Sequence, residues 1–411
     1  MRRAVLLLTI FSVACAEVPV WSNQETPLVT EFFWKYFDYD WKSAEQKKTY
    51  TKNGWYDPRA MYSIDVDRSP VDGRTFITIP RAPGVPASLH TVSAKYGESG
   101  PLLAPYPNWS WYESPDACKG ITSVYRVAID VCHRLWVLDT GRIGENRTCP
   151  AQLLAFDLYT DQLQVKVQIP DNLAVGKIGF GLLITPVVQI GSTCSNTTVY
   201  MAETVGGGLL VWDGSQMKRI EADIFRPEIK EGKFTIAGET FSLFDGIFGM
   251  ALTPHEYQSG SRYLFFRPVA SRSIYAVSTN DLKVDHNDTL RAIEGINYLP
   301  SQATVMAFSS QGTLFYGLTT EISIGCWNMR KQFTQKNFKI ALTDTERLQF
   351  VSGIKVIRDP YSFVGLEEYL LITSNRLQLT MLGKQNLEEV NFRIMRVSVR
   401  EIIENTECDS N

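Results

Sequence analysis

The side chains that most often bind metals or catalyse acid–base reactions are few in this chain and widely separated. The 411 residues include four histidines, at positions 90, 133, 255 and 286, and no two have the spacing of a metal-ligand pair. The sequence has no HExxH or CxxC motif and no GxSxG nucleophile elbow. We therefore expect no structural or catalytic zinc and no cofactor.

Carboxylates are the next group that could do chemistry. The segment 65–73 (DVDRSPVDG) has the spaced aspartates of a calcium-binding loop. The intervening positions, however, hold Arg68, Ser69 and Pro70, and no Glu closes the loop. We interpret the segment as the end of a strand followed by a turn, and expect no metal there.

The elements that position these side chains are strands in a repeated pattern. Six runs rich in β-branched and aromatic residues, 50 to 64 residues apart, begin at Thr75, Arg134, Thr198, Arg262, Gly312 and Tyr369. Each has a second such run after it and an earlier apolar segment before it, such as MYSIDVD or GIFGMALTP. A repeat made only of strands and closed into a ring predicts an all-β, six-bladed β-propeller.

The earlier apolar segment of each repeat is the expected innermost strand, which lines the central channel of a propeller. Gly246, Gly249, Ala307 and Gly353 lie in or beside such segments and suit the crowding where six strands converge. No linker divides the chain, so we expect one domain over residues 17–411.

Three side chains near these inner strands are candidates for a site at the channel mouth. Asp245 directly precedes GIFGMAL, where its carboxylate would pair with an ammonium group or act as a base. The alternative is that Asp245 caps a turn through its own backbone. Thr122 and Tyr125 flank the inner strand of the second blade and are weaker candidates.

The N-terminus has the features of a secretory signal peptide over residues 1–16. A basic start is followed by an apolar run and by the small-residue cleavage site Ala14-Cys15-Ala16. Its removal leaves 39 basic and 44 acidic residues, a net charge of −5. This balance argues against nucleic acid and anionic membrane partners.

Two aromatic-rich segments, 32–41 (FFWKYFDYDW) and 105–112 (PYPNWSWY), suggest stacking on a ligand. Lys35 is their one basic residue, so they lack the repeated basic residues of a nucleic-acid surface. We expect them to pack over the rim of the ring, with stacking on a sugar or an amine as the alternative.

Six cysteines remain after signal removal, an even number that favours three disulfides in a secreted chain over buried free thiols. Cys132 and Cys194 each precede a strand of successive repeats and should lie close together. Pairing Cys326 with Cys408 would clasp the C-terminal tail to the ring, which leaves Cys118 with Cys149. The sequons at Asn108, Asn146, Asn196 and Asn287 are expected glycosylation sites in the same compartment.

Eight segments in collinear order carry a resemblance to a known family. They are WKYFDYDW, GVPASLHTVS, LLAPYPNWSW, RLWVLDTG, LLAFDL, DGIFGMALTP, GCWN and VNFRI. Over nearly the whole mature chain they are similar to the yellow and major royal jelly protein family of insects. The resemblance implies a six-bladed β-propeller, in agreement with the repeat.

The resemblance also implies three ligand-binding positions. Some salivary members of the family in blood-feeding flies bind biogenic amines through a Thr, an Asn and a Phe of the last blade. The matching segments FVSGI and TSNRL place Ser352, Asn375 and Leu377 in these roles. Ser and Asn keep hydrogen-bonding groups, whereas Leu lacks the ring needed for a cation–π contact.

The resemblance implies three functions. The first is a secreted protein of cuticle pigmentation and melanin biology that binds a small aromatic amine, indole or quinone at the channel mouth. The second is a metal-independent dopachrome isomerase, with Asp245 as base and Ser352 and Asn375 as donors. The third is a structural protein of eggshell or cuticle. The sequence does not set an oligomeric state.

Overall fold

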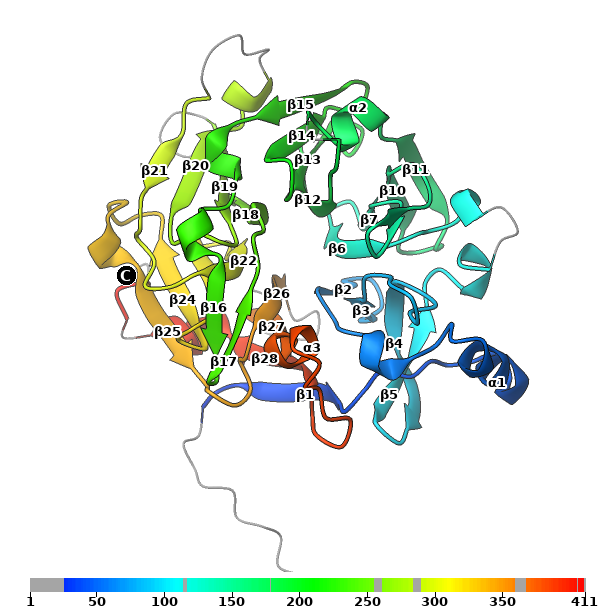
Figure 1. Cartoon of the computed structure of the whole chain (residues 1–411). Coiled ribbons are helices and arrows are strands. Elements are labelled where there is room, and N and C mark those ends of the chain that lie inside the picture. Colours follow the sequence, from blue (N-terminus) through cyan, green and yellow to red (C-terminus); the bar gives the residue numbers. More distant parts are fainter. Residues whose placement is uncertain are drawn as a thin grey trace, which may run out of the picture.

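The computed structural model describes residues 26–113, 117–177, 179–254, 261–283, 290–358, 367–404 and 406–409. Six antiparallel four-stranded sheets follow one another around a central axis (Figure 1). The chain is therefore a six-bladed β-propeller, as the strand repeat predicts. The expected signal segment 1–16 and Asn287 lie outside the described residues.

Each blade is built from four strands, which run from an innermost strand at the axis to an outermost strand at the rim. The innermost strands are β2 (Val66–Arg68), β6 (Val124–Ile129), β12 (Leu183–Ile190), β18 (Ile247–Leu252), β22 (Ala303–Phe308) and β26 (Val351–Arg358). The second strands are β3 (Thr75–Thr78), β7 (Arg134–Asp139), β13 (Thr197–Glu203), β19 (Tyr263–Pro268), β23 (Thr313–Leu318) and β27 (Glu368–Asn375). Both sets contain the segments expected from the sequence.

The outer half of each blade completes the sheet. The third strands are β4 (Leu89–Gly97), β10 (Gln152–Asp157), β14 (Gly208–Trp212), β20 (Ile274–Ser278), β24 (Ser323–Asn328) and β28 (Phe392–Ser398). The outermost strands are β5 (Gly100–Pro105), β11 (Leu163–Gln168), β15 (Met217–Glu221), β21 (Ile293–Gly295), β25 (Lys339–Thr343) and β1 (Val29–Trp34).

Helices and two small hairpins decorate this ring. The helices are α1 (Ala44–Lys52), α2 (Asp171–Ala174), α3 (Leu377–Met381) and α4 (Val399–Ile403). The hairpins are β8 (Arg142–Ile143) with β9 (Asn146–Arg147) and β16 (Lys233–Ile236) with β17 (Glu239–Ser242). None of the helices in the described part of the chain is long and apolar enough to cross a membrane.

The N-terminal strand β1 closes the ring by joining the sheet formed by the C-terminal strands. It pairs antiparallel with β28 from Val29 opposite Arg396 to Trp34 opposite Phe392 (Figure 1). Trp34 is fully buried, and its Nε1 donates a hydrogen bond to the Pro101 carbonyl oxygen in β5 at 2.6 Å. This strand therefore links the last blade to the first, a connection that the sequence analysis missed.

The two aromatic-rich segments pack against each other beside the first blade. The rings of Trp41 and Trp109 stack with their centroids 5.2 Å apart, and Trp109 Nε1 donates to the Asp40 carbonyl oxygen at 3.2 Å. Tyr39 and Tyr56 extend the cluster through edge-on contacts. The segments thus have a structural role next to the ring.

Three disulfides join the pairs expected from the sequence. Cys132 bonds Cys194, Cys118 bonds Cys149, and Cys326 bonds Cys408. The last of these holds the C-terminal tail against β24, where the Cys408 carbonyl oxygen accepts a hydrogen bond from Asn328 Nδ2 at 3.2 Å. Disulfides of this number fit an extracellular protein.

Candidate ligand site at the channel mouth

The first residues of the innermost strands meet at one end of the channel. Thr185 Oγ1 donates to the Phe248 carbonyl oxygen at 2.6 Å, which ties the start of β12 to the start of β18. Thr304 Oγ1 donates to the Val351 carbonyl oxygen and ties β22 to β26 in the same way. The strands approach so closely that a Cβ atom on Gly249 would lie 2.4 Å from the Thr304 carbonyl oxygen. Crowding therefore fixes the side chains at this mouth.

Asp245 lies at this mouth, immediately before β18. Its carboxylate is only partly exposed and has no hydrogen bond or ion pair with any described residue. Desolvation raises the pKa of Asp245 to about 6. Its backbone carbonyl oxygen accepts from the Ala270 N–H at 3.1 Å, so the backbone is anchored while the carboxylate remains available.

Two tyrosines, in the first two blades, lie within electrostatic range of the same carboxylate. Burial raises the pKa of Tyr62 to about 12, and the negative charge of Asp245 adds to this shift. Burial likewise raises the pKa of Tyr125, with further contributions from Tyr62 and Asp245. Both rings are partly exposed and neutral at physiological pH. The mouth therefore combines one unneutralised carboxylate with two phenols.

An arginine and a phenylalanine form a cation–π contact between the second and third blades. The Arg142 guanidinium lies 3.9 Å from the centroid of the Phe180 ring. Its Nε and Nη1 donate to the carbonyl oxygens of Gly181 at 2.9 Å and Glu145 at 2.7 Å. The charge of Arg142 partly offsets the rise in the pKa of Tyr125, which places the two residues within electrostatic reach.

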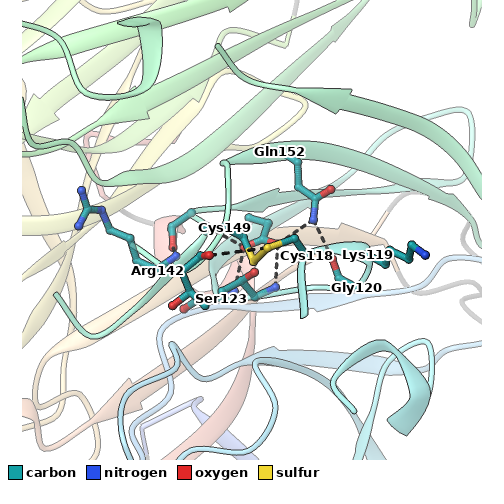
Figure 2. The surroundings of a disulfide bond; sticks show 12 residues. Cys118, Lys119, Gly120, Ser123, Arg142, Cys149 and Gln152 are labelled. Atoms are coloured by element: carbon teal, nitrogen blue, oxygen red, sulfur yellow. Dashed lines mark hydrogen bonds between the residues drawn. A yellow bond between two sulfur atoms is a disulfide. The ribbon is translucent and has the colours of Figure 1, made fainter. Parts of the chain in front are cut away.

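The loop that carries Thr122 is held by a disulfide and a buried carboxylate. Figure 2 shows the bond between Cys118 and Cys149 beside Gln152, whose Nε2 donates to the Gly120 carbonyl oxygen at 2.8 Å. Asp139 accepts from the Thr122 N–H at 2.7 Å and from other N–H groups of the loop. Thr122 is buried, and its Oγ1 has no partner among the described residues.

Ser352, Asn375 and Leu377 gather at the same mouth, on the last blade. Ser352 Oγ and Asn375 Nδ2 both donate to the Ser63 carbonyl oxygen, at 3.3 and 2.5 Å. Asn375 Oδ1 accepts from the Leu377 N–H at 2.9 Å, and all three side chains are buried. These polar groups join the last blade to the first, and their contact with a ligand stays a prediction.

The β16–β17 hairpin lies beside the channel and reaches α3 (Figure 1). Its Glu239 forms an ion pair with Lys384 at 2.7 Å, and Phe241 packs against Phe350, which precedes β26. The hairpin thus connects the Asp245 side of the mouth with the last blade. It is an insertion that breaks the repeat, and the sequence analysis did not identify it.

Tyr62 and the pair formed by Arg142 and Phe180 were also missed. MYSIDVD and VYRVAID align so that Tyr62 and Tyr125 occupy equivalent positions of two repeats. Superposing the repeats would therefore have identified Tyr62 once Tyr125 was chosen. The contact of Arg142 with Phe180 joins two blades, and no local pattern indicates it.

The acidic segment 65–73 forms strand β2 and the turn that follows it, as the sequence predicts. Asp65 and Asp67 lie inside the channel, where the nearest charged groups are Arg126 and Lys355. Among the described residues, no three His, Cys, Asp or Glu side chains form a group that could hold a metal ion. Of the expected glycosylation sites, Asn108, Asn146 and Asn196 are exposed.

The comparisons with known proteins agree with the resemblance found in the sequence. A family model described as Major royal jelly protein matches residues 122–408. Major royal jelly protein 9 of Apis mellifera is 38% identical over 98% of this chain and 96% of its own length. Major royal jelly protein 1 of the same species is 37% identical over 94% of this chain and 90% of its own length.

The solved structures that match this chain are remote in sequence. An alpha-L-arabinanase of Penicillium chrysogenum matches with a TM-score of 0.49 and 10% identity, over 91% of this chain and 98% of that one. Virginiamycin B lyase of Staphylococcus aureus matches with a TM-score of 0.42 and 11% identity, over 83% and 96% of the two chains.

Proposed function

Because this chain belongs to the major royal jelly protein family, we propose that it is a secreted propeller that binds a small aromatic amine at the mouth formed by Asp245, Tyr62 and Tyr125. The three disulfides and the basic, then apolar segment 1–16 support secretion. A role in cuticle pigmentation or melanin biology is consistent with this ligand class, because aromatic amines are its precursors.

The observation that carries the proposal is the unneutralised carboxylate of Asp245. A desolvated anion is costly unless a counter-charge approaches it. No described basic side chain does so, whereas a ligand ammonium group would. The faces of the Tyr62 and Tyr125 rings add cation–π attraction and stack on an aromatic ligand. An aromatic amine carries both an ammonium group for the Asp245 carboxylate and an aromatic ring for the two tyrosines.

A second candidate function, dopachrome isomerisation, is favoured by the pKa of about 6 at Asp245. A base with a pKa close to the working pH is suited to removing a carbon-bound proton. Tyr62 and Tyr125, with hydroxyl groups that stay protonated, would donate hydrogen bonds to the quinone oxygens as negative charge develops.

Calorimetric titration with dopamine and serotonin at pH 7 tests the first function, and dopachrome absorbance tests the second. We expect saturable amine binding that falls at least about tenfold in Asp245→Asn, since the variant removes the charge but keeps the shape. The matched control is Asp223→Asn, an exposed aspartate in an ion pair with Arg226. Absence of saturable binding, or equal affinity in both variants, contradicts the proposal. Catalytic turnover that Asp245→Asn abolishes would establish the enzyme instead.

A further inference from the structure

The channel holds a cavity toward the end opposite Asp245. Its volume is about 280 Å³, and its walls come from the middle and later residues of the inner strands and from a few early ones, such as Thr185 and Phe248. The charged residues that line it are Asp67, Arg126 and Lys355. The Lys355 side chain is 21% exposed, so solvent reaches the cavity. None of these residues belongs to the mouth proposed for amines.

The charged residues form a compact cluster around Asp65. Lys355 Nζ lies 2.9 Å from Asp65 Oδ2 and 4.0 Å from Asp67 Oδ2. Arg126 Nη1 lies 3.4 Å from Asp65 Oδ1, and the guanidinium carbon is 4.3 Å from the centroid of the Phe248 ring. Gly353 makes this approach of strands possible, because a Cβ atom there would lie 2.9 Å from Asp65 Oδ1.

The carboxylate oxygens of the cluster already have donors. Asp65 Oδ2 accepts from the Val127 N–H at 3.1 Å in addition to its ion pair with Lys355. Asp67 Oδ1 accepts from the Arg68 N–H at 2.8 Å, and Asp67 Oδ2 accepts from the Ile129 N–H at 3.2 Å. Further donors from a ligand would add little to either carboxylate.

The two cations, in contrast, keep unused donors. Lys355 Nζ has three N–H groups, and its partners within hydrogen-bond distance are the Val127 carbonyl oxygen at 2.6 Å and Asp65. Arg126 is buried, and its Nε has no partner among the described residues. A buried N–H group without a hydrogen-bond acceptor lowers the stability of the folded state. The cluster therefore favours a ligand that brings an acceptor, and a negative charge would suit both cations.

Apolar residues make up most of the remaining wall. They include Val188, Phe248, Met250, Leu252, Met306 and Phe308. Methionine side chains are flexible and pack against ligands of different shapes, and the rings of Phe248 and Phe308 can pack against an aromatic ligand. Apolar and aromatic side chains beside a few convergent polar groups are a combination found in small-molecule sites.

We propose that this cavity binds a small aromatic carboxylate, with the carboxylate at Lys355 and Arg126 and the ring against Phe248 and the two methionines. The site is distinct from the amine site and does not depend on the proposed function. The protein would then hold ligands of opposite charge at the two ends of one channel.

Titration with three ligands of one shape tests the charge preference. The ligands are 3-phenylpropionate, the neutral 3-phenylpropanol and the cationic 3-phenylpropylamine. We expect the wild-type protein to bind the acid at least about tenfold more tightly than the alcohol. Saturating dopamine should not displace the acid. Equal affinity for the acid and the alcohol, or no saturable binding of the acid, would overturn the proposal.

Two variants locate the bound acid. Lys355→Gln keeps a donor for the Val127 carbonyl oxygen but removes the charge, so affinity for the acid should fall to that of the alcohol. Ala307→Leu fills the cavity without changing a charge and should weaken both ligands. The control is Lys95→Gln, an exposed lysine paired with Asp40 at 2.9 Å. Circular dichroism verifies folding, and unchanged binding of the acid in both cavity variants would contradict the proposed location.

Discussion

At the scale of single residues, two aspartates titrate close to neutral pH. Desolvation raises the pKa of Asp245 at the mouth and of Asp67 in the opposite cavity to about 6 each. For Asp67, Lys355 lowers the pKa and Asp65 raises it, but burial dominates. Both ends of the channel therefore change charge under mildly acidic conditions.

The raised pKa of Asp67 predicts a pH dependence of stability. The folded state holds the proton up to about pH 6, whereas the unfolded chain releases it near 3.8. Between these two pH values the folded state binds more protons than the unfolded chain. The contribution of Asp67 to the free energy of unfolding therefore grows as the pH falls. Relative to Asp67→Asn, the wild-type protein should gain about 2 kcal/mol of unfolding free energy between pH 7 and pH 4. Denaturant titrations at several pH values measure this, and a constant difference would refute it.

At the scale of elements, strand β1 determines how the ring closes. Its register with β28 joins residues from opposite ends of the chain, and Trp34 is buried where the last and first blades meet. Phe33, on the same strand, is 54% exposed. This pair of neighbours separates the effect of burial from that of strand propensity.

Trp34→Ala should lower the free energy of unfolding by about 3–5 kcal/mol, because it leaves a cavity at the closure. Phe33→Ala is the matched control and should lower the free energy of unfolding by less than about 1 kcal/mol. Chemical denaturation followed by circular dichroism measures both. Equal losses in the two variants would show that β1 does not close the ring through Trp34.

The repeated strands were predictable because each carries a local pattern of β-branched and aromatic residues. All six inner segments, including MYSIDVD and SGIKVIRD, lie at the channel as expected. Strand β1 and the β16–β17 hairpin were not predicted. The partner of β1 lies at the far end of the chain, and the hairpin interrupts the period of the repeat.

At the scale of the whole molecule, the Cys326–Cys408 disulfide holds the C-terminal tail on the ring. Replacing both cysteines with alanine should reduce the free energy of unfolding by roughly 2–5 kcal/mol, because the unfolded chain regains entropy. The Cys118–Cys149 disulfide closes a shorter loop, so its removal should lower the free energy of unfolding by somewhat less. Denaturation of the two double variants compares them, and an unchanged stability without Cys326 and Cys408 would contradict the clasp.

The site as a whole was only partly predictable. The positions of Asp245, Thr122 and Tyr125 were predictable because each lies before or within an inner strand, and their role in a site stays a prediction. The channel ion cluster was missed, since Asp65, Arg126 and Lys355 come from three blades and meet only in the folded ring. The closely spaced aspartates around Asp65 stand out in the sequence, but no local pattern marks Arg126 or Lys355 as their partners.

The pH dependence of dopamine affinity tests the central claim most directly. Asp245 is the group at the mouth with a pKa of about 6, whereas Tyr62 and Tyr125 titrate far above neutral pH and Arg142 stays charged. Affinity should rise about tenfold from pH 5 to pH 7 as Asp245 ionises, and Asp245→Asn should remove this rise. An affinity that is independent of pH in the wild-type protein, or the same rise in the variant, would contradict the assignment of the ammonium to Asp245.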